Sequence, residues 1–308
     1  MKRLLALSAL SVFALSLMGD EPIRPLPQTV DYDHAKAALG GELFSDTTLS
    51  RDKTVACLTC HSFNYGGADP RPVSVGINGL KGNIQSPTVY NARYNFKQFW
   101  NGRADSLLEQ AGGPIHNPVE MGMDSAIVEE RLNGDAAYRA EFKEVYGTDR
   151  ISYEQVIDAI TEFEKALVTP NSRFDRYLRG EIALTPLEMK GYNRFKAYGC
   201  VTCHNGINIG SNSFQKMGLF VPYKHEGSVP DRYAVTKNDA HKNVYKVPTL
   251  RNIELTAPYF HDASAKTLEE AVKTMSYHNL GTDLDDEDVK AIVAFLKTLT
   301  GEEPKVLQ

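Results

Sequence analysis

Two short motifs with the pattern Cys-x-x-Cys-His hold all four cysteines of the 308-residue chain. The first motif lies at residues 57–61 and the second at residues 200–204. Their reactive side chains are Cys57, Cys60, His61, Cys200, Cys203 and His204. This spacing is typical of covalent c-type haem attachment, in which the cysteines form thioethers and the histidine binds the iron. The sequence therefore predicts two covalently bound haem c groups.

Two other uses of paired cysteines fit this pattern less well. A thioredoxin-like redox pair does not need the adjacent histidine. A zinc site would require the four cysteines to converge, and it would leave both histidines of the motifs without a function.

In the second half of the chain, Met275 is the expected ligand on the opposite side of the iron from His204. The segment TLEEAVKTM begins with a capping box, Thr267 and Glu270, and places Met275 on the buried face of a predicted helix. His/Met ligation closes the iron and is typical of an electron-transfer haem. Met217 is an alternative ligand, and Met275 could also be an ordinary core methionine.

The first half lacks such a ligand. Residues 62–115 contain neither histidine nor methionine, so we expect the iron bound by His61 to keep a position where a small oxidant can bind. Four nearby side chains suit chemistry at an open iron, and these are Phe99, Trp100, Gln110 and Glu120. A carboxylate such as Glu120 could carry a proton from one peroxide oxygen to the other, and the Gln110 amide could hold peroxide by hydrogen bonds.

Amphipathic helices are expected on both sides of a boundary at residues 169–170. Periodic apolar residues predict helices over 151–170, 185–199, 267–275 and 284–301, while Gly, Pro, Asn and Ser dominate 62–118 and 205–262. We expect these two long segments to be loops with short turns that wrap around the haems. The predicted domains are residues 20–169 and 170–308.

The first 19 residues read as a secretory signal peptide. Lys2 and Arg3 precede an apolar run that ends at Met18 and is too short to span a bilayer, although a retained membrane anchor is the alternative. We therefore expect export to the periplasm. The formal net charge of -5 gives no reason to expect a nucleic-acid partner.

The sequence resembles the bacterial dihaem cytochrome c peroxidase family over nearly all of the chain after the signal segment. The resemblance rests on the blocks LGGELFSDTTLSRDKTVACLTCH, SPTVYNARYNFKQFWNGRA, QAGGPIHNPVEMGM, YGCVTCHNGINIGSNSFQKMG, KVPTLRNIELTAPYFHDAS and TLEEAVKTM. It implies a mainly α fold with two cytochrome c-like helical domains, each with one haem, and a homodimer.

The resemblance also assigns roles. The first haem is implied to reduce hydrogen peroxide, and the haem at His204 and Met275 to receive electrons from a small c-type cytochrome or cupredoxin. Gln110 and Glu120 fall on the family's active-site positions, and Trp100 falls on the tryptophan between the haems. His261 matches a family position near the second haem.

A calcium ion near the interface of the haems is also implied by the resemblance. Backbone carbonyls corresponding to Thr256 and Pro258 would hold it, and hard cations take such oxygen ligands readily. Relatives have an asparagine ligand in an RNAPT-like segment, whereas this chain reads NIQSPT and has Gln85 at that position.

A second departure from the family concerns the open iron. Members that are inactive when fully oxidised close this iron with a histidine, but this chain reads SVGINGLKG and has Ile77 at that position. We therefore expect that the enzyme needs no reductive activation, or that it uses loop motion only to admit substrate. His116, Met121 and Met123 are the alternative closing ligands.

Two other functions are considered beside peroxidase activity. A dihaem electron carrier without catalysis would need two saturated irons, which the composition of residues 62–115 disfavours. A related dihaem enzyme matures a tryptophan-derived quinone on a partner protein, but it has a tyrosine where this chain has Met275.

Overall fold

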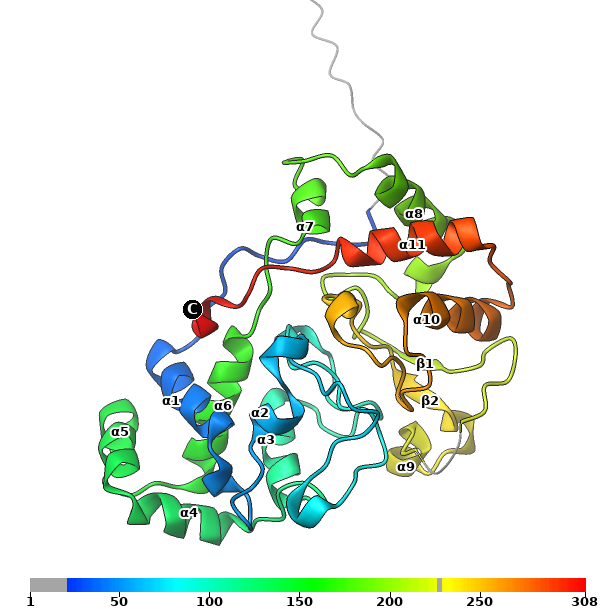
Figure 1. Cartoon of the computed structure of the whole chain (residues 1–308). Helices are drawn as coiled ribbons and strands as arrows, with labels where there is room; N and C mark the ends of the chain where they lie inside the picture. Colours follow the sequence, from blue (N-terminus) through cyan, green and yellow to red (C-terminus); the bar gives the residue numbers. More distant parts are fainter. Residues whose placement is uncertain (1–20, 226–228) are drawn as a thin grey trace, which may run out of the picture.

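The computed structural model describes residues 21–225 and 229–308, so the predicted signal peptide lies outside the described residues. The fold is mainly α, as expected (Figure 1). Within the described residues, the one sheet is a two-stranded antiparallel ladder of β1 (Phe214–Lys216) and β2 (Val244–Lys246). None of the described helices combines the length and the apolar character that a membrane span requires.

The first hydrophobic core is built on a close pair of helices, α1 (His34–Ser45) and α6 (Tyr153–Ala166). A Cβ atom at Gly40 would overlap the carbonyl oxygen of Ala159, so only glycine allows the two backbones to approach this closely. The other helices of this unit are α2 (Cys57–Cys60), α3 (Leu107–His116), α4 (Ser125–Gly134) and α5 (Ala136–Tyr146).

The second core repeats this arrangement with α8 (Pro186–Ala197) and α11 (Asp286–Lys297). Here a Cβ at Gly191 would overlap the carbonyl oxygen of Ala291. Its remaining helices are α7 (Arg173–Leu178), α9 (Arg232–Thr236) and α10 (Leu268–Met275). The same glycine-mediated helix pair thus organises both halves of the chain.

The predicted helix starts are confirmed. Thr185 and Glu188 form a capping box at the start of α8, and Thr267 and Glu270 form one at the start of α10. The expected domain boundary falls in the segment between α6 and α7.

Two expected loop segments contain more structure than predicted. Helix α3 lies inside 62–118, where Gly112, Gly113 and Pro114 hid its pattern, and the side chain of Ser106 caps it. The segment 205–262 contains β1, β2 and α9.

Short helical turns connect the longer elements throughout the described chain. They are η1 (Thr47–Leu49), η2 (Phe63–Tyr65), η3 (Ile77–Gly79), η4 (Ala92–Tyr94), η5 (Cys200–Thr202), η6 (Asp239–His241), η7 (Ile253–Leu255), η8 (Ser276–Leu280) and η9 (Lys305–Leu307).

Each end of the described chain packs on the unit that is farther from it in sequence. Ile23 belongs to the second core, whereas Val306 and Leu307 pack against the first, and the C-terminus lies near α1 (Figure 1). A buried ion pair lies where the N-terminal segment reaches the second unit. Both carboxylate oxygens of Asp175 accept hydrogen bonds of 3.0 Å from Arg251.

The same two side chains bind the crossing backbone. The amide of Leu26 donates to Asp175 (3.2 Å), and Arg251 donates to the carbonyl of Arg24 (3.0 Å). Both members of the pair have no exposed side-chain surface. The pair therefore fastens the first described residues to the second unit.

We predict that the buried pair behaves as a coupled unit in folding. Asp175→Leu alone would leave the Arg251 charge buried without a partner and lower the free energy of unfolding by about 3–5 kcal/mol. Adding Arg251→Met removes the stranded charge and should recover part of that loss. Denaturant unfolding followed by circular dichroism measures the free energy of unfolding. It is applied to the haem-loaded wild type, the two single variants and the double variant, which together form a double-mutant cycle. Strictly additive effects of the two substitutions would contradict this coupling.

Candidate functional site

One internal cavity of about 330 Å³ connects the two Cys-x-x-Cys-His motifs. His61 lines it from the first unit, and Cys200, Cys203 and His204 line it from the second. Most of its surface is contributed by apolar side chains. A flat, apolar macrocycle held at each motif fits a cavity of this kind.

The His61 ring has one nitrogen that could bind a metal. His61 follows α2, and its Nδ1 lies 3.3 Å from the carbonyl oxygen of Gly67, which can only accept a hydrogen bond. Nδ1 therefore carries the proton and Nε2 keeps its lone pair for a metal. Burial lowers the pKa of His61, so the neutral form that coordination requires is favoured.

His204 is also held neutral. It is buried, and burial lowers its pKa to about 4, with the backbone of Ile209 partly opposing the shift. Met275, the last residue of α10, lines the same cavity. Met217 is buried and lines it too, so both methionines that the sequence offered lie at the cavity wall.

The cysteines do not behave as a reactive redox pair. Burial raises the pKa of the Cys57 thiol to about 12 and that of Cys200 to about 11, whereas redox-active Cys-x-x-Cys motifs have a lowered pKa. In the part of the chain that the structure describes, no three His, Cys, Asp or Glu side chains gather as a metal site. The raised pKa values of the thiols favour haem attachment over a reactive redox pair.

Glu120, Gln110 and Phe99 line the cavity together with His61. The Glu120 carboxylate accepts a hydrogen bond of 2.6 Å from the Asn117 amide. Burial raises the pKa of Glu120, while the charge of Arg103 and the Asn117 bond oppose the rise. The Arg103 guanidinium lies 3.3 Å from the centre of the Phe99 ring. A carboxyl group with a raised pKa and an amide therefore face the same space.

Ile77 lies in the first core and does not line the cavity. Its amide donates to the carbonyl of Glu120 (2.9 Å), and a Cβ at Gly76 would overlap the carbonyl oxygen of Val119. The loop at Ile77 is therefore docked against the Glu120 loop. Ile77 thus makes an apolar packing contact in the first core.

The alternative closing ligands also lie away from the cavity. The His116 ring bonds the carbonyl of Met123 (2.8 Å), and Met121 and Met123 are buried in the first core. None of these three side chains is among those that line the cavity.

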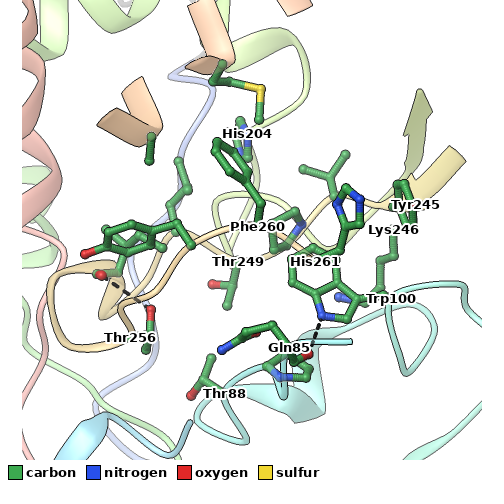
Figure 2. Close-up of a pocket in the computed structure, with 18 of the residues that line it drawn as sticks. Gln85, Thr88, Trp100, His204, Tyr245, Lys246, Thr249, Thr256, Phe260 and His261 are labelled. Carbon is green, nitrogen blue, oxygen red and sulfur yellow. Dashed lines mark hydrogen bonds between the residues drawn. The ribbon is translucent and has the colours of Figure 1, made fainter. Parts of the chain in front are cut away.

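Trp100 joins the two units. Its Nε1 donates to the carbonyl of Gln85 (2.8 Å), its ring lies 6.1 Å from that of His261, and its carbonyl accepts from the amide of Lys246 (2.7 Å). The amide of Gln85 in turn donates to the carbonyl of His261 (2.9 Å). Figure 2 shows Trp100, Gln85 and His261 meeting at this junction.

The three residues considered for calcium lie near this junction. Gln85, Thr256 and Pro258 all line the cavity, and the peptide bond before Pro258 is cis. The carbonyl of Gln85 already accepts the Trp100 bond, which leaves the side-chain oxygen of Gln85 as its remaining oxygen for a cation.

Two buried charged side chains at the cavity escaped the sequence analysis. Glu164 is 4% exposed, one of its oxygens has no partner in the described parts of the chain, and burial raises its pKa to about 8. It follows Ile160 by four residues on α6, so an acid within the apolar stripe was a usable signal. Lys246 is 7% exposed, and no pattern in the sequence marks it.

Comparisons with known proteins agree with this geometry. The family model described as di-haem cytochrome c peroxidase matches residues 34–183, and the model described as cytochrome c matches residues 189–300. Cytochrome c551 peroxidase of Nitrosomonas europaea is 46% identical over 98% of this chain and 91% of its own length.

Two further matches extend the comparison. Cytochrome c peroxidase Ccp of Escherichia coli is 46% identical over 92% of this chain, which spans 62% of that longer protein. A solved MauG-like protein associated with microbial copper homeostasis superposes with a TM-score of 0.79 at 28% identity, covering 94% of this chain and 95% of that one. The chain belongs to the di-haem cytochrome c peroxidase family.

Proposed function

We propose that this chain is an exported, periplasmic peroxidase that reduces hydrogen peroxide to two waters. The reaction consumes one peroxide, two electrons and two protons. A small reduced c-type cytochrome or cupredoxin supplies the electrons one at a time. The observation that supports the proposal is the lining of the cavity, to which the second half of the chain contributes Met275 and the first half contributes Glu120 and Gln110.

Haem c held at His61 would supply the iron chemistry that binds peroxide and delivers the electrons that cleave the O–O bond. Glu120 would take a proton from one peroxide oxygen and return it to the other, which leaves as water. The Gln110 amide orients peroxide through N–H donation without adding charge. Arg103, which opposes the rise in the Glu120 pKa, helps to keep a fraction of this carboxyl group ionised.

Electrons enter at the site formed by His204 and Met275 and pass to the first unit near Trp100. The indole Nε1 of Trp100 donates to the carbonyl of Gln85, and the backbone carbonyl of Trp100 accepts from the amide of Lys246 in the second unit. We include in the proposal a calcium ion held by the carbonyls of Thr256 and Pro258 with Gln85, and a homodimer as the functional assembly.

Maturation of a tryptophan-derived quinone on a partner protein is the second candidate, because the MauG-like structure shares this fold. Met275 at the cavity wall favours the peroxidase, since thioether ligation suits a closed electron-entry haem.

We predict that Glu120→Gln lowers peroxide turnover by about 10²–10⁴-fold, because the amide cannot accept and return a proton. Both haems should remain attached and reducible. Steady-state oxidation of reduced cytochrome c measures turnover, and the pyridine haemochrome spectrum measures haem content. Glu130→Gln, which alters an exposed acid of α4, is the matched control and should turn over at the wild-type rate. Wild-type turnover in Glu120→Gln would remove the assigned role.

The pH profile follows from the same carboxyl group. Catalysis needs the ionised form, and a raised pKa means that this form is lost at a higher pH than for an ordinary glutamate. The acid limb of kcat/KM should therefore lie above pH 4.5, the ordinary value, and should vanish from the residual activity of Glu120→Gln. An unchanged acid limb in the variant would assign it to another group.

We predict that the fully oxidised protein shows one high-spin haem and turns over peroxide without prior reduction. The reason is that Ile77 cannot bind iron and that His116, Met121 and Met123 do not line the cavity. Electron paramagnetic resonance of the ferric protein measures the spin states, and stopped-flow mixing with peroxide measures the lag. Two low-spin signals together with a lag removed by pre-reduction would contradict this prediction.

A further inference from the structure

Lys246 is a buried ammonium group without a side-chain partner among the described residues. It is the last residue of β2, is 7% exposed, and makes neither an ion pair nor a side-chain hydrogen bond with any residue in the described ranges. Lysines are almost never buried in this way unless they are paired, because an unpaired charge loses its hydration without compensation. No residue in the described ranges supplies its counterion, and a bound anionic group can provide one.

Several observations place that counterion in the cavity. Lys246 lines the cavity, and the amide of Lys246 is fixed to the carbonyl of Trp100 at the junction of the two units. Figure 2 shows its side chain extending from beside Tyr245 toward Trp100. Burial alone lowers the pKa of Lys246 to about 8, and no carboxylate of the described residues offsets this effect.

The charge of the molecules that can enter the cavity indicates which of them can pair with Lys246. Hydrogen peroxide is neutral and cannot pair with an ammonium group. Haem carries two propionate carboxylates on one edge of an apolar ring, so its binding brings anions into this cavity. A carboxylate and a desolvated ammonium group form a charge-assisted hydrogen bond that compensates the burial of both.

We propose that Lys246 is a haem-binding residue that pairs with a haem propionate at the junction beside Trp100. The inference rests on the haem occupancy of the proposed function, but it does not depend on peroxide turnover. The pair neutralises one carboxylate next to the path between the haems. It thereby raises the midpoint potential of the haem that carries this carboxylate, because a nearby positive charge favours the ferrous state.

The test compares Lys246→Met with the wild type by spectroelectrochemical titration of both haems. Loss of the charge should shift the ferrous-to-ferric equilibrium of one haem toward ferric by on the order of tenfold, which is about 59 mV for one electron. Lys246→Arg keeps the charge and should restore the wild-type potential. Lys242→Met removes the same charge from an exposed side chain of the same segment and should change neither haem by more than about twofold.

A second measurement is needed because the propionate could take up a proton when Lys246 is replaced, which would reduce the change in midpoint potential. The propionate bending band of the resonance Raman spectrum should shift in Lys246→Met and stay in place in Lys242→Met. If Lys246→Met fails to fold, Lys246→Gln carries the same comparison with a smaller change of shape. Unchanged potentials and an unchanged propionate band in a fully haem-loaded variant overturn the proposal. Absence of peroxide turnover in the wild-type protein, together with the expected change of potential in Lys246→Met, would instead fault the proposed function alone.

Discussion

The shared cavity is the constraint on which the rest of the structure depends. Two cofactor attachment motifs from different halves of the chain face one apolar space, so the segments between the helices must enclose it. This explains why long stretches rich in Gly, Pro and Asn are ordered as loops and short turns. Their backbone bonds, such as those of Trp100 and Gln85, close the wall between the units.

The two units repeat a scaffold and differ in chemistry. Gly40 and Gly191 allow the same close helix pair in each half, and each motif histidine is held in its neutral form. The difference lies in what each unit contributes to the cavity wall, because Met275 comes from the second unit, whereas Glu120 and Gln110 come from the first. A repeated fold can therefore carry one site suited to electron entry and another suited to an oxidant.

Local signals in the sequence predicted the parts of this arrangement that depend on local chemistry. The Cys-x-x-Cys-His spacing, the capping boxes at Thr185 and Thr267 and the apolar stripe of α6 each act over a few residues, so they could be recognised directly. Helix α3 was hidden by its glycines and proline, because its stability comes from packing against α6. The crossing chain ends and the buried pair of Asp175 and Arg251 join residues far apart in sequence, and no local pattern encodes them. The burial of Lys246 could not be predicted for a related reason, since residues of both units together form its environment.

Unequal iron coordination is the central claim, and the stoichiometry of carbon monoxide binding tests it most directly. Carbon monoxide binds ferrous haem only where the sixth position is open or weakly held. Titration of the fully reduced protein should give one carbon monoxide per chain, at the His61 haem, with the haem at His204 and Met275 unchanged. Binding to neither haem, or to both haems with similar affinity, would contradict the division of the cavity into a closed electron-entry site and an open peroxide site.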